Sequence, residues 1–145
     1  MGKEEIKQTR ALYAEAKSGK VDMAVFGCPH CTVTELKTMA FLLNGKKVGN
    51  NQRLWVGMPY QMYYLAQFMG YTGVIENAGG VIASACMAAI PDSPIPSDVK
   101  VIATNSFKAA HYISRLTKGR VNVLIGDMDA CIDAVTGGEW KGDNP

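Results

Sequence analysis

The sequence has no apolar run long enough to cross a membrane. Its longest apolar stretches fall far short of the roughly 20 residues that a membrane-spanning helix needs. Its first residues are charged rather than apolar, which predicts no signal peptide. Internal repeats and low-complexity segments are also missing. We therefore expect a protein that stays out of the membrane, with the cytoplasm as its location.

An excess of charge of one sign is missing too. The 15 lysines and arginines nearly balance the 13 aspartates and glutamates, so the formal net charge is only +2. The basic residues are scattered, and nothing favours binding to nucleic acid or to an anionic membrane. Hydrophobic residues make up 48% of the 145 residues, which is enough for a folded core. We expect a single domain over residues 1–145, with a flexible tail at 139–145.

Short apolar segments alternate with helical patterns along the chain. The apolar segments, which we expect to be strands, are 21–26, 52–57, 81–85, 99–103 and 121–125. The segments predicted to be helices are 4–17, 32–43, 59–70, 106–116 and the residues that follow Asp127. The side chains expected to be buried on the helix after Pro59 are Met62, Leu65, Ala66 and Met69. This alternation predicts a three-layer α/β/α fold with a mostly parallel sheet of about four or five strands.

The segment Cys28-Pro29-His30-Cys31 lies between the first predicted strand and a helix. Four cysteines in a chain with a sizeable core favour thiol chemistry or metal binding over structural disulfides. One interpretation is a redox pair, in which the helix amino terminus stabilises the Cys28 thiolate and Cys31 resolves a mixed disulfide. A second is metal binding, and a third is that the thiols are only packed in the turn. The motif alone leaves all three open.

A further cysteine, Cys86, follows the third predicted strand. If the first and third strands are parallel and close, Cys28 and Cys86 converge on one crevice at the carboxyl ends of the strands. Two thiolates in such a crevice suit iron or zinc. The alternative is that Cys86 is a small core residue. We expect Cys131 to be a core residue, because it belongs to the apolar stripe of the last helix.

The segment Thr104–Lys108 also follows a predicted strand and opens a helix. Backbone N–H groups at a helix start can hold an anion, with Asn105, Ser106 and Lys108 as additional donors. The alternative is an ordinary helix cap followed by a solvated lysine. The sequence alone does not decide between the two.

Several separated motifs together resemble the aconitase X family, in the carboxyl-terminal part of its catalytic (large) subunit. These motifs are GCPH at 27–30 with TVTEL after it, NAGGV at 77–81, TNSFKAAHY at 104–112 and GDMDACIDAVTGG at 126–138. A more distant resemblance is to the third domain of other aconitases, in which cysteines also follow strands. The resemblance implies a hydro-lyase that dehydrates a small hydroxy acid, similar to cis-3-hydroxyproline or to a phosphorylated mevalonate.

The resemblance also implies a cofactor and roles for single residues. The cofactor would be iron or an iron–sulfur cluster, with Cys28 and Cys86 as its ligands. His30 would lie near the cluster or the substrate as a catalytic residue. The side chains that would hold the substrate's carboxylate or phosphate are Asn105, Ser106 and Lys108, and we count Ser106 and Lys108 among the catalytic residues as well.

The chain also departs from these families. An aconitase X large subunit is far longer, with further domains amino-terminal to this region and a small swivelling domain or subunit. Other aconitases have a third cysteine where Ala89 stands, and the resemblance assigns no role to Cys31. We therefore expect those domains as partners and no turnover by the chain alone. Two alternatives stay open: a thioredoxin-like thiol–disulfide oxidoreductase, and a non-catalytic binding or assembly domain.

Overall fold

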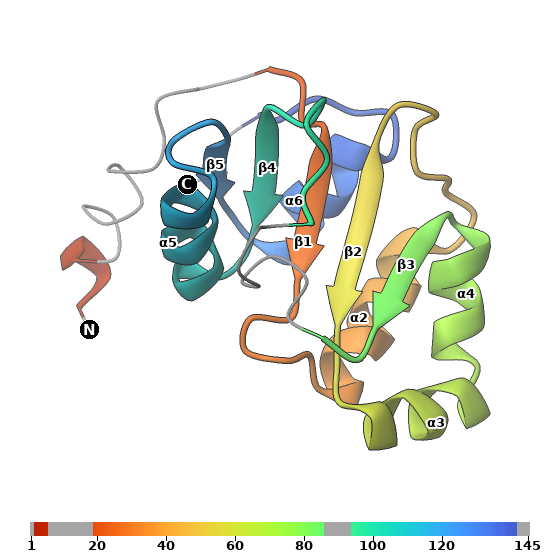
Figure 1. The fold of residues 1–145 in the computed structure, drawn as a ribbon. Coiled ribbons are helices and arrows are strands. Elements are labelled where there is room, and N and C mark those ends of the chain that lie inside the picture. The colour runs from red at the N-terminus through yellow and green to blue at the C-terminus, as the bar shows by residue number, and fades with distance from the viewer. Residues whose placement is uncertain (1, 6–18, 86–93, 142–145) are drawn as a thin grey trace.

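The computed structural model describes residues 2–5, 19–85 and 94–141 of the 145 (Figure 1). The predicted helix at 4–17 lies almost entirely outside these ranges. Cys86 and Ala89 lie outside them as well. No helix in the described part of the chain is long and apolar enough to cross a membrane.

A single sheet of five parallel strands forms the centre of the molecule, in the order β3-β2-β1-β4-β5. The strands are β1 (Met23–Phe26), β2 (Arg53–Gly57), β3 (Gly80–Ala83), β4 (Val101–Thr104) and β5 (Asn122–Ile125). The prediction of a mostly parallel α/β sheet is confirmed. Because the strands are parallel, their carboxyl ends share one edge, at the arrowheads in Figure 1. β1 is central, and β2 separates it from β3.

Helices cover both faces of the sheet, as the three-layer prediction requires. They are α2 (Val33–Leu43), α3 (Tyr60–Phe68), α4 (Tyr71–Asn77), α5 (Phe107–Leu116) and α6 (Met128–Val135). Successive residues of β1 point to opposite faces. Ala24 and Phe26 pack in the cluster that holds α2 and α6, whereas Met23 and Val25 pack in the cluster that holds α5. The two faces therefore have separate hydrophobic cores.

Two of the helix starts form as the sequence predicts. At α2, the Thr32 hydroxyl accepts from the Glu35 N–H at 3.2 Å, and a Glu35 carboxylate oxygen accepts from the Thr32 N–H at 2.7 Å. This reciprocal pair is a capping box. At α5, the Ser106 hydroxyl accepts from the Ala109 N–H at 3.1 Å. Both caps occupy backbone N–H groups that the first turn of a helix leaves without a helical partner.

The buried face of α3 differs from the prediction. Of the four side chains expected to be inside, only Ala66 is buried, whereas Met62, Leu65 and Met69 are exposed. Tyr63 packs beside Ala66 against the core instead. Apolar and aromatic residues surround this helix on every side, so their spacing does not indicate which face is buried.

The predicted tail at 139–145 contains a packed residue near its start. Trp140 is buried, and its backbone forms an antiparallel bridge with Gly19 through two hydrogen bonds of 2.9 and 3.2 Å. Trp140 is therefore packed against the fold, whereas residues 142–145 lie outside the described ranges. The indole ring holds this segment because a large apolar surface is removed from water.

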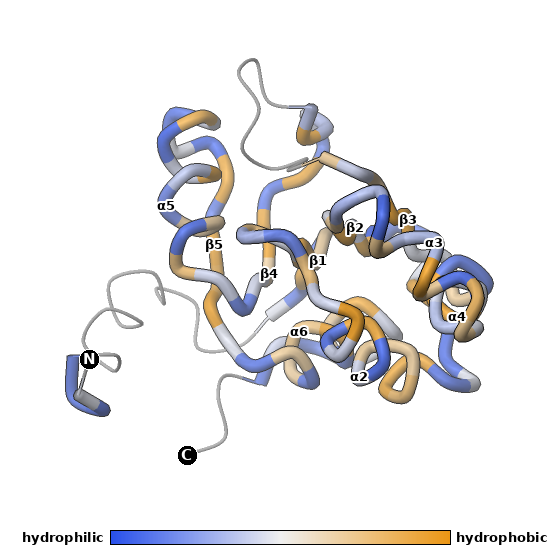
Figure 2. The backbone as a smooth tube through the Cα atoms, turned by 90° about the horizontal axis from the view of Figure 1, so that it is seen from below, coloured by the Kyte–Doolittle hydropathy of each residue, from blue (hydrophilic) through white to orange (hydrophobic). Residues whose placement is uncertain are grey.

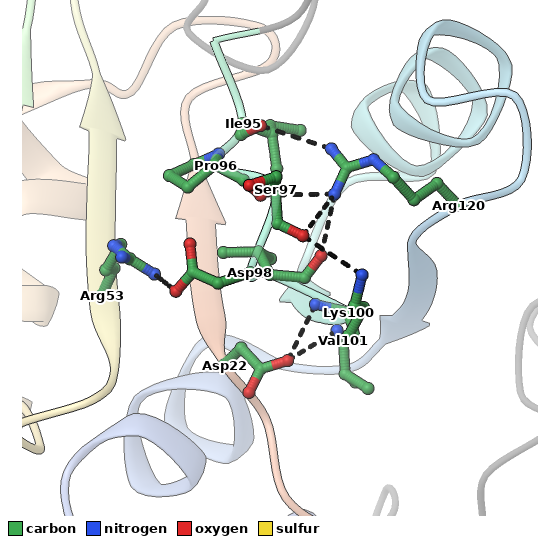
Figure 3. A network of polar contacts seen from close by, with 10 residues as sticks. Asp22, Arg53, Ile95, Pro96, Ser97, Asp98, Lys100, Val101 and Arg120 are labelled. Atoms are coloured by element: carbon green, nitrogen blue, oxygen red, sulfur yellow. Dashed lines mark hydrogen bonds and ion pairs between the residues drawn. The ribbon is translucent and has the colours of Figure 1, made fainter.

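The amino-terminal edge of the sheet is closed by polar contacts (Figure 3). One carboxylate oxygen of Asp22, just before β1, accepts from the N–H groups of Lys100 and Val101 at 2.9 Å each. Arg53 forms an ion pair with Asp98 at 3.0 Å, and the hydrogen bond that it donates lowers the pKa of the Asp98 carboxyl. The Arg120 guanidinium donates to four backbone carbonyls, those of Ile95, Pro96, Ser97 and Val99. These contacts fix the segment that leads into β4.

Candidate functional site

Two of the predicted site segments meet at the carboxyl edge of the sheet. β1 and β4 pair directly, with Val25 opposite Thr104, so the turns that follow them are neighbours. The Ser106 hydroxyl donates to the backbone carbonyl of Cys28, which joins the two turns. The segment that carries Cys28 and His30 therefore lies beside the segment that carries Lys108.

The two cysteines of the C-x-x-C motif pack on opposite faces of the sheet. Cys28 is 5% exposed and belongs to the cluster of Val25 and α5. Cys31 is 3% exposed and belongs to the cluster of Phe26 and α2. Neither forms a disulfide, and the Cys28–Pro29 peptide bond is cis. The structure thus gives this pair no shared surface on which to act as a dithiol.

Cys31 is also chemically unsuited to redox work. Burial, followed by the nearby charge of Glu35, raises the pKa of the Cys31 thiol from 9.0 to about 12. The reactive form of a cysteine is the thiolate, which is scarce at neutral pH for such a thiol. Helix α2 begins at Val33 with Thr32 as its cap, so its amino terminus lies four residues beyond Cys28. The geometry does not support the redox interpretation.

Close backbone contacts around Gly57 bring together the ends of three strands. A Cβ atom on Gly57, the last residue of β2, would lie 2.8 Å from the Ala85 carbonyl oxygen and 3.2 Å from that of Gly27. It would also lie 3.7 Å from Cδ2 of His30. A Cβ on Gly27, where φ is +99°, would lie 2.1 Å from the Gly57 oxygen. Only glycine therefore allows these strand ends to approach so closely.

This convergence matters for the second predicted ligand, because Ala85 directly precedes Cys86 in the sequence. The chain that follows β3 passes Gly57 at Ala85, and Gly57 is also in contact with the turn after β1. Sequence reasoning missed the role of Gly57. The available signal was a glycine at the end of an apolar strand, where a side chain would ordinarily be expected.

Among the predicted site residues, His30, Asn105 and Lys108 are exposed at this edge. Ser106 is in a different position, since its hydroxyl donates to Cys28 and accepts from Ala109. Its backbone N–H donates to the hydroxyl of the buried Thr104 at 3.3 Å. Asn105 and Lys108 can therefore face an anion from solvent, whereas Ser106 holds the two turns together.

Within the ranges that the structure describes, no three histidine, cysteine or acidic side chains cluster closely enough to hold a metal ion. Cys28 lies at the edge, and its predicted partner Cys86 is outside the described residues. Cys131, predicted to be a core residue, is fully buried on α6. The pairing of Cys28 with Cys86 therefore stays a prediction.

Comparison with known proteins connects this geometry to a family. The family model described as "Aconitase X third domain" matches residues 21–137. The phosphomevalonate dehydratase large subunit of Methanocaldococcus jannaschii is 38% identical over 130 residues, covering 89% of this chain and 30% of that protein. The cis-3-hydroxy-L-proline dehydratase of Hypocrea jecorina is 31% identical over 130 residues, covering 89% of this chain and 22% of the relative.

A solved structure shares the fold. The crystal structure of Thermococcus kodakaraensis aconitase X in its holo-form aligns with a TM-score of 0.67 at 32% identity, over 87% of this chain and 31% of that one. The chain thus spans about 30% of the length of the first of these relatives. Since the family model covers well over half of the chain, the chain belongs to the aconitase X family and corresponds to its third domain.

Proposed function

We propose that this chain is the domain of a hydro-lyase that contributes cysteine metal ligands and a substrate-anion loop to the dehydration of a small hydroxy acid. The observation that carries the proposal is the contact between the Cys28 and Ser106 turns, together with the convergence of strand ends at Gly57. The relatives support the reaction class, since their names are those of phosphomevalonate and cis-3-hydroxy-L-proline dehydratases. Either substrate type carries a carboxylate or a phosphate for an anion loop to hold.

The cofactor in this proposal is iron or an iron–sulfur cluster, held by Cys28 and Cys86. Cys28 fits such a group, because it is a thiol at the sheet edge where the β1, β2 and β3 ends converge. Thiolates are the ligands that iron–sulfur clusters use. When bound, the metal supplies a Lewis acid for the departing hydroxyl. Cys31 packs on the other face, so any third ligand comes from another residue.

The other residues bind and orient the substrate. Lys108 and Asn105, exposed at the start of α5, hold the substrate's carboxylate or phosphate and set its orientation. His30 is exposed beside Gly57 and takes part in proton transfer at the substrate. Ser106 keeps the anion loop in contact with the cysteine turn. The general base that removes the carbon-bound proton is not assigned to this chain.

The proposal includes partners, since this chain covers only 30% of the Methanocaldococcus jannaschii relative and 22% of the Hypocrea jecorina relative. Four matched phosphomevalonate dehydratases are named as large subunits, which implies a smaller one. We expect the remaining domains and a small domain or subunit to complete the site, and we expect no turnover by this chain alone.

The test is anaerobic reconstitution with iron and sulfide, followed by iron analysis and visible absorption. We expect iron binding in the unmodified chain and in Cys31→Ser, with loss in Cys28→Ser and Cys86→Ser. Far-UV circular dichroism checks that each variant is folded. Equal iron in Cys28→Ser, or loss confined to Cys31→Ser, would overturn the ligand assignment.

A further inference from the structure

The exposed surface of α3 is unusually apolar. We define the α3 face as the exposed side chains of this helix and its C-cap: Tyr60, Met62, Tyr64, Leu65, Phe68 and Met69. Their exposed fractions run from 39% at Met62 to 92% at Phe68. Six of the nine large hydrophobic side chains exposed in the described residues lie on this one helix. Such a concentration of exposed apolar side chains on one helix is typical of an interaction site.

The chemistry of the α3 face is that of a protein interface. The segment 59–70 contains no charged residue, and its exposed polar side chains besides the tyrosines are Gln61 and Gln67. Tyrosine, phenylalanine and methionine are the residue types that interface cores favour. The rings of Tyr60 and Tyr64 meet edge to face at 4.9 Å, and their hydroxyls lie 2.6 Å apart. Part of the face is therefore already ordered before a partner binds.

The α3 face adjoins the candidate site. Helix α3 begins three residues after Gly57, and the Met58 N–H donates to the Ala83 carbonyl at 3.0 Å, which ties the start of the helix to the end of β3. Figure 2, which looks at the edge where the strands end, shows α3 beyond β2 and β3, with hydrophobic residues along its tube. A partner seated on α3 is therefore at the same edge of the sheet as the turn that carries Cys28 and His30.

We propose that the α3 face is the docking surface for the rest of a dehydratase large subunit. The partner is the two thirds of that subunit that lie outside this domain, and it contacts α3 through an apolar patch of its own. This inference rests on the proposed function. The matched relatives have that additional length, since this chain covers 30% of one and 31% of another. The described residues also lack a third metal ligand, which a partner seated on this side of the site can supply. A second copy of this chain would cover the helix but bring only the same ligands again.

The test compares the isolated chain with a chimera, in which the chain replaces the matched region of the Methanocaldococcus jannaschii large subunit. Hydroxyl-radical footprinting measures how fast each side chain is oxidised. We expect oxidation of Met62, Phe68 and Met69 to fall several-fold in the chimera. Tyr112, exposed on α5 at the opposite face of the sheet, is the matched control and should not change. Unchanged oxidation of the α3 face in the folded chimera would overturn the proposal.

A second measurement separates the remaining outcomes. Light scattering of the isolated chain should give a monomer, and a dimer whose α3 face is protected would overturn the proposal in favour of a second copy. The Leu65→Lys/Phe68→Lys variant should keep the thermal stability of the isolated chain, yet lower that of the chimera. If the chimera does not fold, the complementary part of the relative is co-expressed with a tag, and it should retain the unmodified chain but not this variant. Neither readout depends on bound iron, so a failed interface is distinguishable from a failed hydro-lyase assignment.

Discussion

The two edges of the sheet use their polar groups in opposite ways. At the amino-terminal edge, Asp22 and Arg120 are bonded to backbone groups of the segment that leads into β4. At the carboxyl edge, His30 and Lys108 are exposed. The charged side chains of the first edge bond to the protein itself and stabilise the fold. The polar side chains named at the second edge are exposed, so a ligand can contact them. The difference indicates a functional site at the edge where polar side chains have no structural role.

The largest expected effect concerns Cys31, which lies at the carboxyl edge but is buried in the core. Since burial and Glu35 raise the pKa of its thiol to about 12, we expect iodoacetamide at pH 8 to alkylate it roughly a thousand-fold more slowly than in urea. The protonated thiol favours the folded state below pH 9, and this contribution is lost as the pH rises toward 12. Mass spectrometry measures the rate at each cysteine. Equal rates in folded and unfolded chains would show that Cys31 is accessible and reopen the redox interpretation.

The next effect tests the contact between Gly27 and Gly57. We expect Gly27→Ala to cost about 3 kcal/mol or more, since its Cβ would lie 2.1 Å from a backbone oxygen and its φ is positive. Gly45→Ala is the matched control, because its φ is +76° but nothing lies within 4 Å of the added Cβ. That change should cost only about 1 kcal/mol. Urea unfolding measures both, and similar costs would show that the close approach does not matter.

A smaller loss is expected at the opposite edge. Asp22→Asn replaces a carboxylate that accepts two backbone N–H groups, and we expect a loss of about 1–3 kcal/mol in the free energy of unfolding. Glu139→Gln, a charge change at an exposed position, is the control and should have little effect. If both variants unfold at the same urea concentration, the amino-terminal edge does not depend on this charge.

The smallest effect on stability is expected at Lys108, which is exposed at the carboxyl edge. Lys108→Met should change the free energy of unfolding by less than about 0.5 kcal/mol. In the proposed dehydratase assembly it should weaken anion binding by about 2 kcal/mol, the size of a charge-assisted hydrogen bond. Inhibition by inorganic phosphate measures this loss, with Lys118→Met as the control. Strong destabilisation by Lys108→Met would mean that charged side chains stabilise the fold at both edges.

The helix starts and the candidate site were predictable to different extents. The capping box of Thr32 and Glu35 and the cap at Ser106 follow from residues three positions apart, so the sequence reveals them. The contact between the Cys28 and Ser106 turns also required β1 and β4 to be neighbours, which only the fold shows. The buried side of α3 was not predictable, because apolar residues on all sides of a helix do not indicate which side faces the core. The pairing of Cys28 with Cys86 stays a prediction.

The sequence by itself determined the alternation of strands and helices, where α2 and α5 begin, and the family resemblance. These depend on residues near one another in the chain, whose spacing carries the information. Only the tertiary structure decided that β2 separates β1 from β3, that Cys28 and Cys31 pack on opposite faces, and that Gly27 meets Gly57. Those features arise from contacts between segments distant in the sequence, and no local pattern encodes how closely two such backbones approach.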